Sequence, residues 1–206
     1  MIKKRIKRSL RVSKYILYKE TLVDAREHFW SFIGAFFGIA VIAFIQSNTF
    51  TNTENIFLIG SFGASSVLIY GSIQSPLAQP RNLIGGHIIS AIVGVTIFKL
   101  VPDIIWLTAP LAVSLSIVLM QLTKTIHPPG GATALIAVTG ADNIKALGYG
   151  YVISPVLTGC LILLVVALIF NNITPNRRYP TNRRFTRFVK RALVRNKVIG
   201  YNRKTN

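Results

Sequence analysis

The central two-thirds of this 206-residue sequence has very little charge. Of 24 lysines and arginines and 6 acidic residues, the segment between Phe29 and Phe170 contains four basic and three acidic ones. A soluble domain of that length needs many charged groups on its surface, so the composition excludes a soluble fold. Long apolar runs with charge confined to their flanks are what a lipid bilayer requires. The sequence therefore predicts an integral membrane protein.

Cysteine is nearly absent as well. Cys160 is the single cysteine and stands inside an apolar run, so an intrachain disulfide is excluded and we interpret it as a small buried side chain. The first twenty residues stay basic for too long to form a secretory signal, and no cleaved signal is expected. The apolar segments also lack carboxylates, Cys/His clusters and nucleophile–base pairs of recognisable spacing. We therefore expect no enzyme, no metal site and no cofactor.

Four apolar runs are long enough to cross a bilayer, which takes about 20 helical residues. They cover residues 29–48, 83–101, 104–122 and 149–170. Two further runs, 55–71 and 127–140, are too short or are interrupted by glycine and proline. The fold class expected is an all-α polytopic membrane protein with four long transmembrane helices and two short helices that are broken or re-entrant.

These pieces follow one another as long, short, long, twice over, which suggests an internal duplication. The segment GASSVLIY (63–70) aligns with GATALIAV (131–138), and each precedes a long span with an interior glycine, Gly94 or Gly159. Small residues also recur in membrane helices for packing reasons, so chance can supply one such match. Two three-element units would be inverted about an axis in the membrane plane, as in many transporters.

Basic residues gather at the two ends of the chain, nine before Phe29 and eleven after Phe170. The positive-inside rule then places both termini in the cytoplasm, most simply of a bacterial plasma (inner) membrane, and requires an even number of crossings. Six crossings fit slightly better, because they put Arg81 and Lys124 on the cytoplasmic side. Four crossings, with re-entrant short segments, remain the alternative.

The charge distribution also divides the chain into a basic N-terminal segment (1–28), a transmembrane domain (29–172) and a basic C-terminal tail (173–206). In both ends apolar residues recur at helical spacing among lysines and arginines, which predicts amphipathic helices on anionic membrane lipids. Nucleic-acid binding is the alternative for such ends, but the positive-inside rule already explains their charge. We expect anionic lipids, and no nucleic acid, as partners. A homo-oligomer is compatible with these features.

The stretch KTIHPPGGATALIAV (124–138) breaks an apolar run with His127, two prolines and two glycines. At membrane depth such a break frees backbone groups that lipid cannot satisfy, so it must be buried in protein or line a wet cavity. Pro128 and Pro129 favour the first turn of a helix, whose positive N-terminal end, with unpaired N–H groups, would suit a small anion. Residues 61–65 offer a similar helix end in the first half.

Each of these residues also has a structural interpretation. Glycine pairs permit tight helix packing, and His127 can simply lie in a loop or interface. His87 stands within a predicted span, where an ionisable side chain indicates function, although a neutral imidazole can also hydrogen-bond a neighbouring helix. Arg81 either anchors the chain at the membrane interface or attracts a negatively charged substrate.

Several long segments resemble the HPP family of integral membrane proteins, named for its His-Pro-Pro motif. They are residues 62–94, HPPGGATALIAV (127–138), 154–172 and RRYP (177–180). The resemblance covers roughly residues 28–180 and implies a small polytopic membrane protein, usually described with four transmembrane helices. Members in cyanobacteria and plant plastids are implicated in nitrite transport, so the resemblance implies nitrite as a substrate.

The resemblance supplies no agreed binding residues, so their roles are our interpretation. We expect a transporter or channel for a small monovalent anion, with nitrite suspected; a non-transporting membrane scaffold or assembly component is the alternative. The sequence does not separate a channel from a proton-coupled carrier. The predicted substrate-binding residues are Gly63, Ala64, Ser65, Arg81, Asn82, His87, His127, Gly130, Gly131, Ala132 and Thr133.

Overall fold

A computed structural model describes residues 25–49, 59–174 and 177–182. Within them the chain is helical without strands, and four helical segments are long and apolar enough to cross a membrane. These are α2 (Ala25–Thr49), α4 (Pro80–Leu100), α5 (Ile105–Leu122), and the turn η4 (Val152–Leu157) with α8 (Thr158–Phe170). They coincide with the four predicted spans, so the all-α polytopic fold is confirmed. The predicted amphipathic ends lie outside the described residues.

Two short helices lie between the long ones. α3 (Gly60–Ser66) continues into the wider turn η2 (Val67–Gly71), and α6 (Pro128–Thr139) has 12 residues. At 1.5 Å per residue, a 12-residue helix covers about 18 Å of a hydrocarbon core that is about 30 Å thick. Each short helix therefore leaves non-helical backbone at membrane depth. The small elements η3 (Pro76–Ala78) and α7 (Asp142–Ala146) lie in connections.

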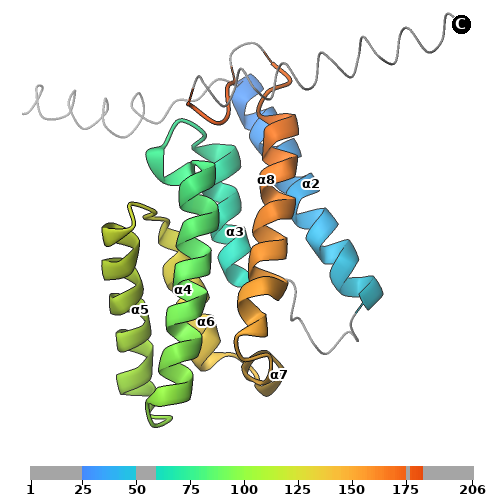
Figure 1. The fold of residues 1–206 in the computed structure, drawn as a ribbon. Coiled ribbons are helices and arrows are strands. Elements are labelled where there is room, and N and C mark those ends of the chain that lie inside the picture. Colours follow the sequence, from blue (N-terminus) through green and yellow to red (C-terminus); the bar gives the residue numbers. More distant parts are fainter. Residues whose placement is uncertain (1–24, 50–58, 175–176, 183–206) are drawn as a thin grey trace, which may run out of the picture.

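Successive elements alternate in direction through the fold (Figure 1). α2, α4 and α6 run one way, and α3, α5 and α8 run the other. Arg177, beyond α8, bonds Glu27 at the start of α2 and the Tyr70 carbonyl at the end of η2, so both described ends lie on one side. Each short helix therefore runs antiparallel to the long helix before it, which agrees with the six-element alternative.

The two halves exchange their third helix. α4 of the first half packs against α5 and α6, whereas α8 of the second half packs against α2 and α3 (Figure 1). A Cβ at Gly94 would lie 2.6 Å from the Ala134 carbonyl oxygen of α6, and one at Gly159 would collide with the Phe62 ring of α3. Corresponding glycines thus let each third helix approach the other half's short helix, which supports the inverted duplication.

Polar and apolar side chains are arranged as a bilayer demands. Phe32, Phe44 and Trp106 are more than half exposed on α2 and α5, where lipid tails would cover them. The interior instead contains polar groups that the backbone and each other must satisfy. The buried polar residues of the short helices and their neighbours are Ser61, Ser65, Ser66, His87, Ser90, Thr108, Ser116, Thr125, His127 and Thr133.

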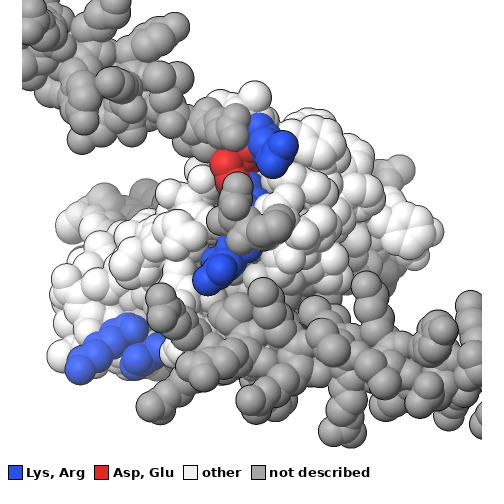
Figure 2. Space-filling model, turned by 90° about the horizontal axis from the view of Figure 1, so that it is seen from above, with Lys and Arg blue, Asp and Glu red and all other residues white. Residues whose placement is uncertain are grey.

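The end of the fold that holds both described termini is basic. Figure 2 looks onto this end and shows lysines and arginines as separate patches, with an acidic side chain beside one of them. Lys145 at the opposite end is 3.6 Å from Asp103. The described charged residues are Arg26, Glu27, Arg81, Lys124, Arg177 and Arg178 at the basic end, and Lys99, Asp103, Asp142 and Lys145 at the other.

A buried arginine joins three helices at this basic end. Arg177 is 2% exposed, and its Nη1 donates to Glu27 Oε2 (2.9 Å) while its Nη2 donates to the Tyr70 carbonyl (2.7 Å) and Asn171 Oδ1 (2.9 Å). Burial lowers the pKa of Arg177 from its usual value, and the charge of Glu27 opposes that change. The guanidinium therefore ties the start of α2 to the ends of η2 and α8.

Candidate functional site

A buried hydrogen-bond network joins two histidines at the centre of the fold. Ser65 Oγ lies 2.7 Å from His87 Nε2 and 2.9 Å from His127 Nε2. On its other side, His87 Nδ1 lies 2.6 Å from Thr133 Oγ1. All four side chains have no exposed surface, and the imidazole centroids are 5.0 Å apart. Four of the eleven predicted site residues thus come together in one cluster, which we call the histidine network.

The network lies where both short helices meet α4. Ser65 belongs to α3, His87 to α4, and His127 precedes the first residue of α6, which also carries Thr133. Glycine makes this approach possible, since a Cβ at Gly86 would lie 2.5 Å from the Cβ of His127. The network therefore bridges the first and second halves of the chain.

A backbone carbonyl determines how protons are placed in the network. His127 Nδ1 lies 2.9 Å from the Leu77 carbonyl oxygen, which can only accept, so Nδ1 carries the proton and Nε2 of the neutral ring accepts. The Ser65 hydroxyl then donates to His127 Nε2 and accepts from His87 Nε2–H. His87 Nδ1 finally accepts from the Thr133 hydroxyl, because this contact (2.6 Å) is much shorter than the one from the same hydroxyl to the Pro129 carbonyl (3.4 Å). With both imidazoles neutral, every donor of the histidine network has an acceptor.

The surroundings of the network are apolar and hydroxyl-bearing. The Phe62 ring lies edge-on to the His87 imidazole, with 5.8 Å between the ring centroids. The Tyr151 hydroxyl donates to the Thr133 carbonyl (3.2 Å). Glu27, Asp103 and Asp142, the described acidic residues, lie at the ends of the fold. Within the described residues no three metal-ligating side chains are grouped together.

The start of α6 offers few free backbone donors. Pro128 and Pro129 have no N–H, and the N–H of Gly130 donates to the His127 carbonyl at 2.8 Å. The positive end of the helix dipole remains, but a ligand here would meet side chains rather than a row of N–H groups. This narrows the predicted anion site to the histidine network and its neighbours.

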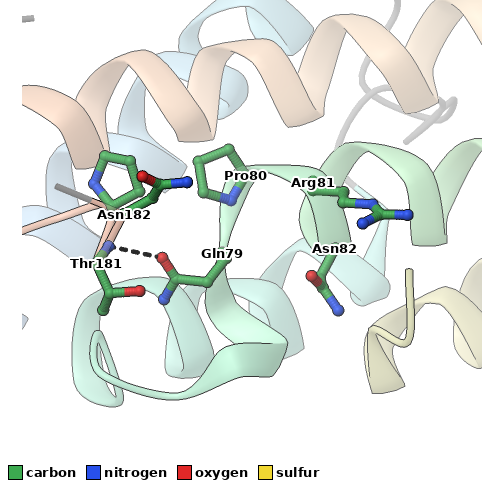
Figure 3. A pocket seen from close by; sticks show the side chains of 7 residues that line it. Gln79, Pro80, Arg81, Asn82, Thr181 and Asn182 are labelled. Carbon is green, nitrogen blue, oxygen red and sulfur yellow. Dashed lines mark hydrogen bonds between the residues drawn. The ribbon is translucent and has the colours of Figure 1, made fainter. Parts of the chain in front are cut away.

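Arg81 and Asn82, two further predicted residues, lie away from the network. Arg81 Nη2 donates to the Thr123 carbonyl (2.8 Å) and Asn82 Nδ2 to the Ile126 carbonyl (2.7 Å), so both hold the loop that leads to His127. They also border a pocket of about 410 Å³ at the basic end. In Figure 3 the Arg81 side chain extends away from Thr181, whose N–H donates to Gln79 Oε1.

The remaining predicted residues are small and do not join the network. Gly63 and Ala64 are exposed on the outer face of α3. Gly130 is buried against α4, where a Cβ would lie 2.8 Å from Ser90 Oγ. Gly131 and Ala132 are half-buried, and a Cβ at Gly131 would lie 3.9 Å from a Val113 methyl group of α5. Of these residues, Gly130 allows α6 to pack closely on α4, whereas Gly63 and Ala64 face outward.

Two groups at the site, the Leu77 carbonyl and the Tyr151 hydroxyl, are not recognisable from the sequence. The Leu77 carbonyl orients His127, although any residue at that position supplies a carbonyl. Tyr151 reaches Thr133 from the start of the last span, and tyrosines are common at the ends of membrane spans whether or not they contact a site. Its position only becomes informative once the start of the last span is placed beside α6.

The fold and its buried polar centre define a polytopic helical membrane protein with two broken helices. The family model described as HPP, transmembrane region, matches residues 20–180, and the chain belongs to this family. It is similar to two transmembrane proteins of Dictyostelium discoideum, at 48% and 46% identity over 163 residues. These alignments cover 76% of this chain, but 51% and 56% of the relatives, so the chain spans about half their length. No solved structure matches it.

Proposed function

We propose that this protein transports a small monovalent anion, with nitrite as the first substrate to test. The observation that carries the proposal is the histidine network, a fully buried set of ionisable and hydroxyl groups between two broken helices. Ionisable side chains at membrane depth are costly and therefore indicate a function. Inverted repeats with broken helices are an arrangement that many transporters use. An enzymatic reaction is not proposed.

Ser65 Oγ occupies the position where an anion would bind in this proposal. It lies between the Nε2 atoms of His87 and His127, at 2.7 and 2.9 Å. A planar oxyanion such as nitrite, nitrate or formate offers several oxygen acceptors and can replace the hydroxyl as the partner of both rings. Exposed Arg81 and Lys124 at the basic end would raise the local concentration of anions.

Purified protein in proteoliposomes should take up nitrite faster than protein-free liposomes. Nitrite, nitrate, formate, chloride and ammonium are compared side by side, and we expect saturable uptake of oxyanions and none of ammonium. His87→Ala removes a network imidazole and should reduce uptake at least about tenfold. His28→Ala is the matched control, because His28 is exposed on α2. Absence of uptake for every ion would favour the scaffold alternative.

We further propose a bacterial plasma membrane with both termini in the cytoplasm and anionic lipids beside them, because the basic end should face inward. Single cysteines at Asp103 and Lys124 test this orientation with a membrane-impermeant maleimide. Cys160 is buried and supplies the unlabelled background. We expect labelling in intact cells at position 103, and at position 124 only after permeabilisation. Labelling of position 124 in intact cells, with protection at 103, would invert the topology.

A further inference from the structure

The two network histidines differ in what their second nitrogen can do. His127 Nδ1 faces the Leu77 carbonyl oxygen, which accepts and never donates. His87 Nδ1 faces Thr133 Oγ1, a hydroxyl that can do either. His87 can therefore present an Nε2–H while neutral, with the Thr133 hydroxyl donating to its Nδ1. For His127 to present an Nε2–H and keep its Nδ1–H bond to the Leu77 carbonyl, both ring nitrogens must carry a proton. His127 must then be an imidazolium.

We infer that His127 takes up one proton for each anion bound, so that the protein is an electroneutral proton–anion cotransporter. This rests on the proposed function and specifies its coupling. An anion between the two Nε2 atoms needs an N–H from both, and the carbonyl of Leu77 prevents a neutral His127 from providing the second. The proton comes from water on the side that supplies the anion, forms the Nε2–H bond, and leaves with the anion on the other side.

Neither charge is favourable at this place alone. An imidazolium at His127 would be buried, without a described carboxylate near it, and at the positive end of the α6 dipole. An anion alone would have His87 as a donor but would meet the Nε2 lone pair of His127. Bound together, the two charges neutralise each other, and each makes the binding of the other more favourable.

No other described group near the network competes for this role. Of the elements packed against it, α3 contributes serines, α5 and the loop after it contribute Met120 and Thr125, and α6 contributes Thr133. From the last span come the hydroxyl of Tyr151 and, behind it, the thiol of Cys160, both buried. The nearest basic side chain of α4, Arg81, lies at its exposed first turn. Among the described groups around the network, the two imidazoles are thus the ones that can accept a proton and release it again.

Coupled flux measurements on the full chain in proteoliposomes test the inference. A trapped pH dye reports proton entry during nitrite uptake, and a potassium gradient with valinomycin sets the membrane potential. Protein-free liposomes correct for diffusion of nitrous acid. We expect one proton to enter with each nitrite, an initial rate independent of potential, and accumulation of nitrite by about tenfold in a tenfold inward proton gradient.

Two variants separate the histidines. His127→Gln supplies an amide N–H that donates without taking up a proton. Downhill uptake should remain, but it should depend on the membrane potential and no longer acidify the lumen. His87→Gln should slow uptake yet keep proton entry, and His28→Gln should match the wild type. Potential-driven uptake without protons by the wild type would overturn the coupling while leaving the proposed function intact. Loss of proton entry in His87→Gln, with proton entry kept in His127→Gln, would equally overturn the role of His127. Absence of any uptake by the wild type would refute the proposed function.

Discussion

Replacing Arg177 by leucine should lower the free energy of unfolding in lipid or detergent by roughly 3–5 kcal/mol, because three charge-assisted hydrogen bonds of a buried guanidinium are lost, one of them to a carboxylate that is 30% exposed. The substitution would leave the Tyr70 carbonyl, Asn171 Oδ1 and the Glu27 carboxylate without their shared donor. Tyr70 lies in the last turn of η2, and its carbonyl would keep the Ser31 hydroxyl (2.8 Å) as its side-chain donor. The expected result is a protein that inserts but unfolds at a much lower temperature.

Arg178 is the matched control for this substitution. It is exposed beside Arg177, and Arg178→Leu should change the unfolding free energy by about 0.5 kcal/mol or less. Thermal unfolding of both variants in the same detergent, with wild type in parallel, gives the comparison. Equal stability of the two variants would show that the buried contacts of Arg177 contribute little to the fold.

The long spans were predictable because span length and charge depletion are properties of the sequence itself. The six alternating elements were one of two alternatives, since hydropathy cannot tell whether a 12-residue helix continues across the membrane or returns. The exchange of α4 and α8 between halves was not predictable. It depends on which helix faces meet, and Gly94 and Gly159 reveal this only when their partners, Ala134 and Phe62, are placed.

The candidate site was predictable in its residue types more than in its geometry. His87, His127, Ser65 and Thr133 stood in motifs, and an ionisable residue inside a span is costly enough to attract attention. The sequence placed Arg81 in the same group, yet its side chain supports the loop before His127. Motif membership does not distinguish a residue that lines a site from one that positions it.

The start of α6 shows how one sequence signal can have two consequences. The prolines at 128 and 129 correctly predicted the first turn of a helix, and with it a positive dipole end. The same prolines remove two of the N–H groups that would bind an anion there. The dipole therefore acts on the network through space, and the donors must come from imidazole side chains.

Ser65→Ala should destabilise the protein by roughly 2–4 kcal/mol, because it leaves His87 Nε2–H and His127 Nε2, which are both buried, without this partner. Ser66→Ala is the matched control. Ser66 is the next residue, is 5% exposed, and its hydroxyl has no hydrogen-bond partner. Its replacement should change stability by about 0.5 kcal/mol or less, or raise it slightly.

Nitrite should then distinguish the two serine variants by ligand-induced stabilisation. In Ser65→Ala an anion meets both imidazoles without displacing a hydroxyl, so the rise in unfolding temperature with nitrite should exceed that of the wild type. Ser66→Ala should respond as the wild type does. Thermal unfolding with and without nitrite, at constant ionic strength set by a sulfate salt, makes the measurement. If nitrite shifts Ser65→Ala and Ser66→Ala equally, the anion binds away from the two Nε2 atoms, since the network hydroxyl would then have no part in its binding.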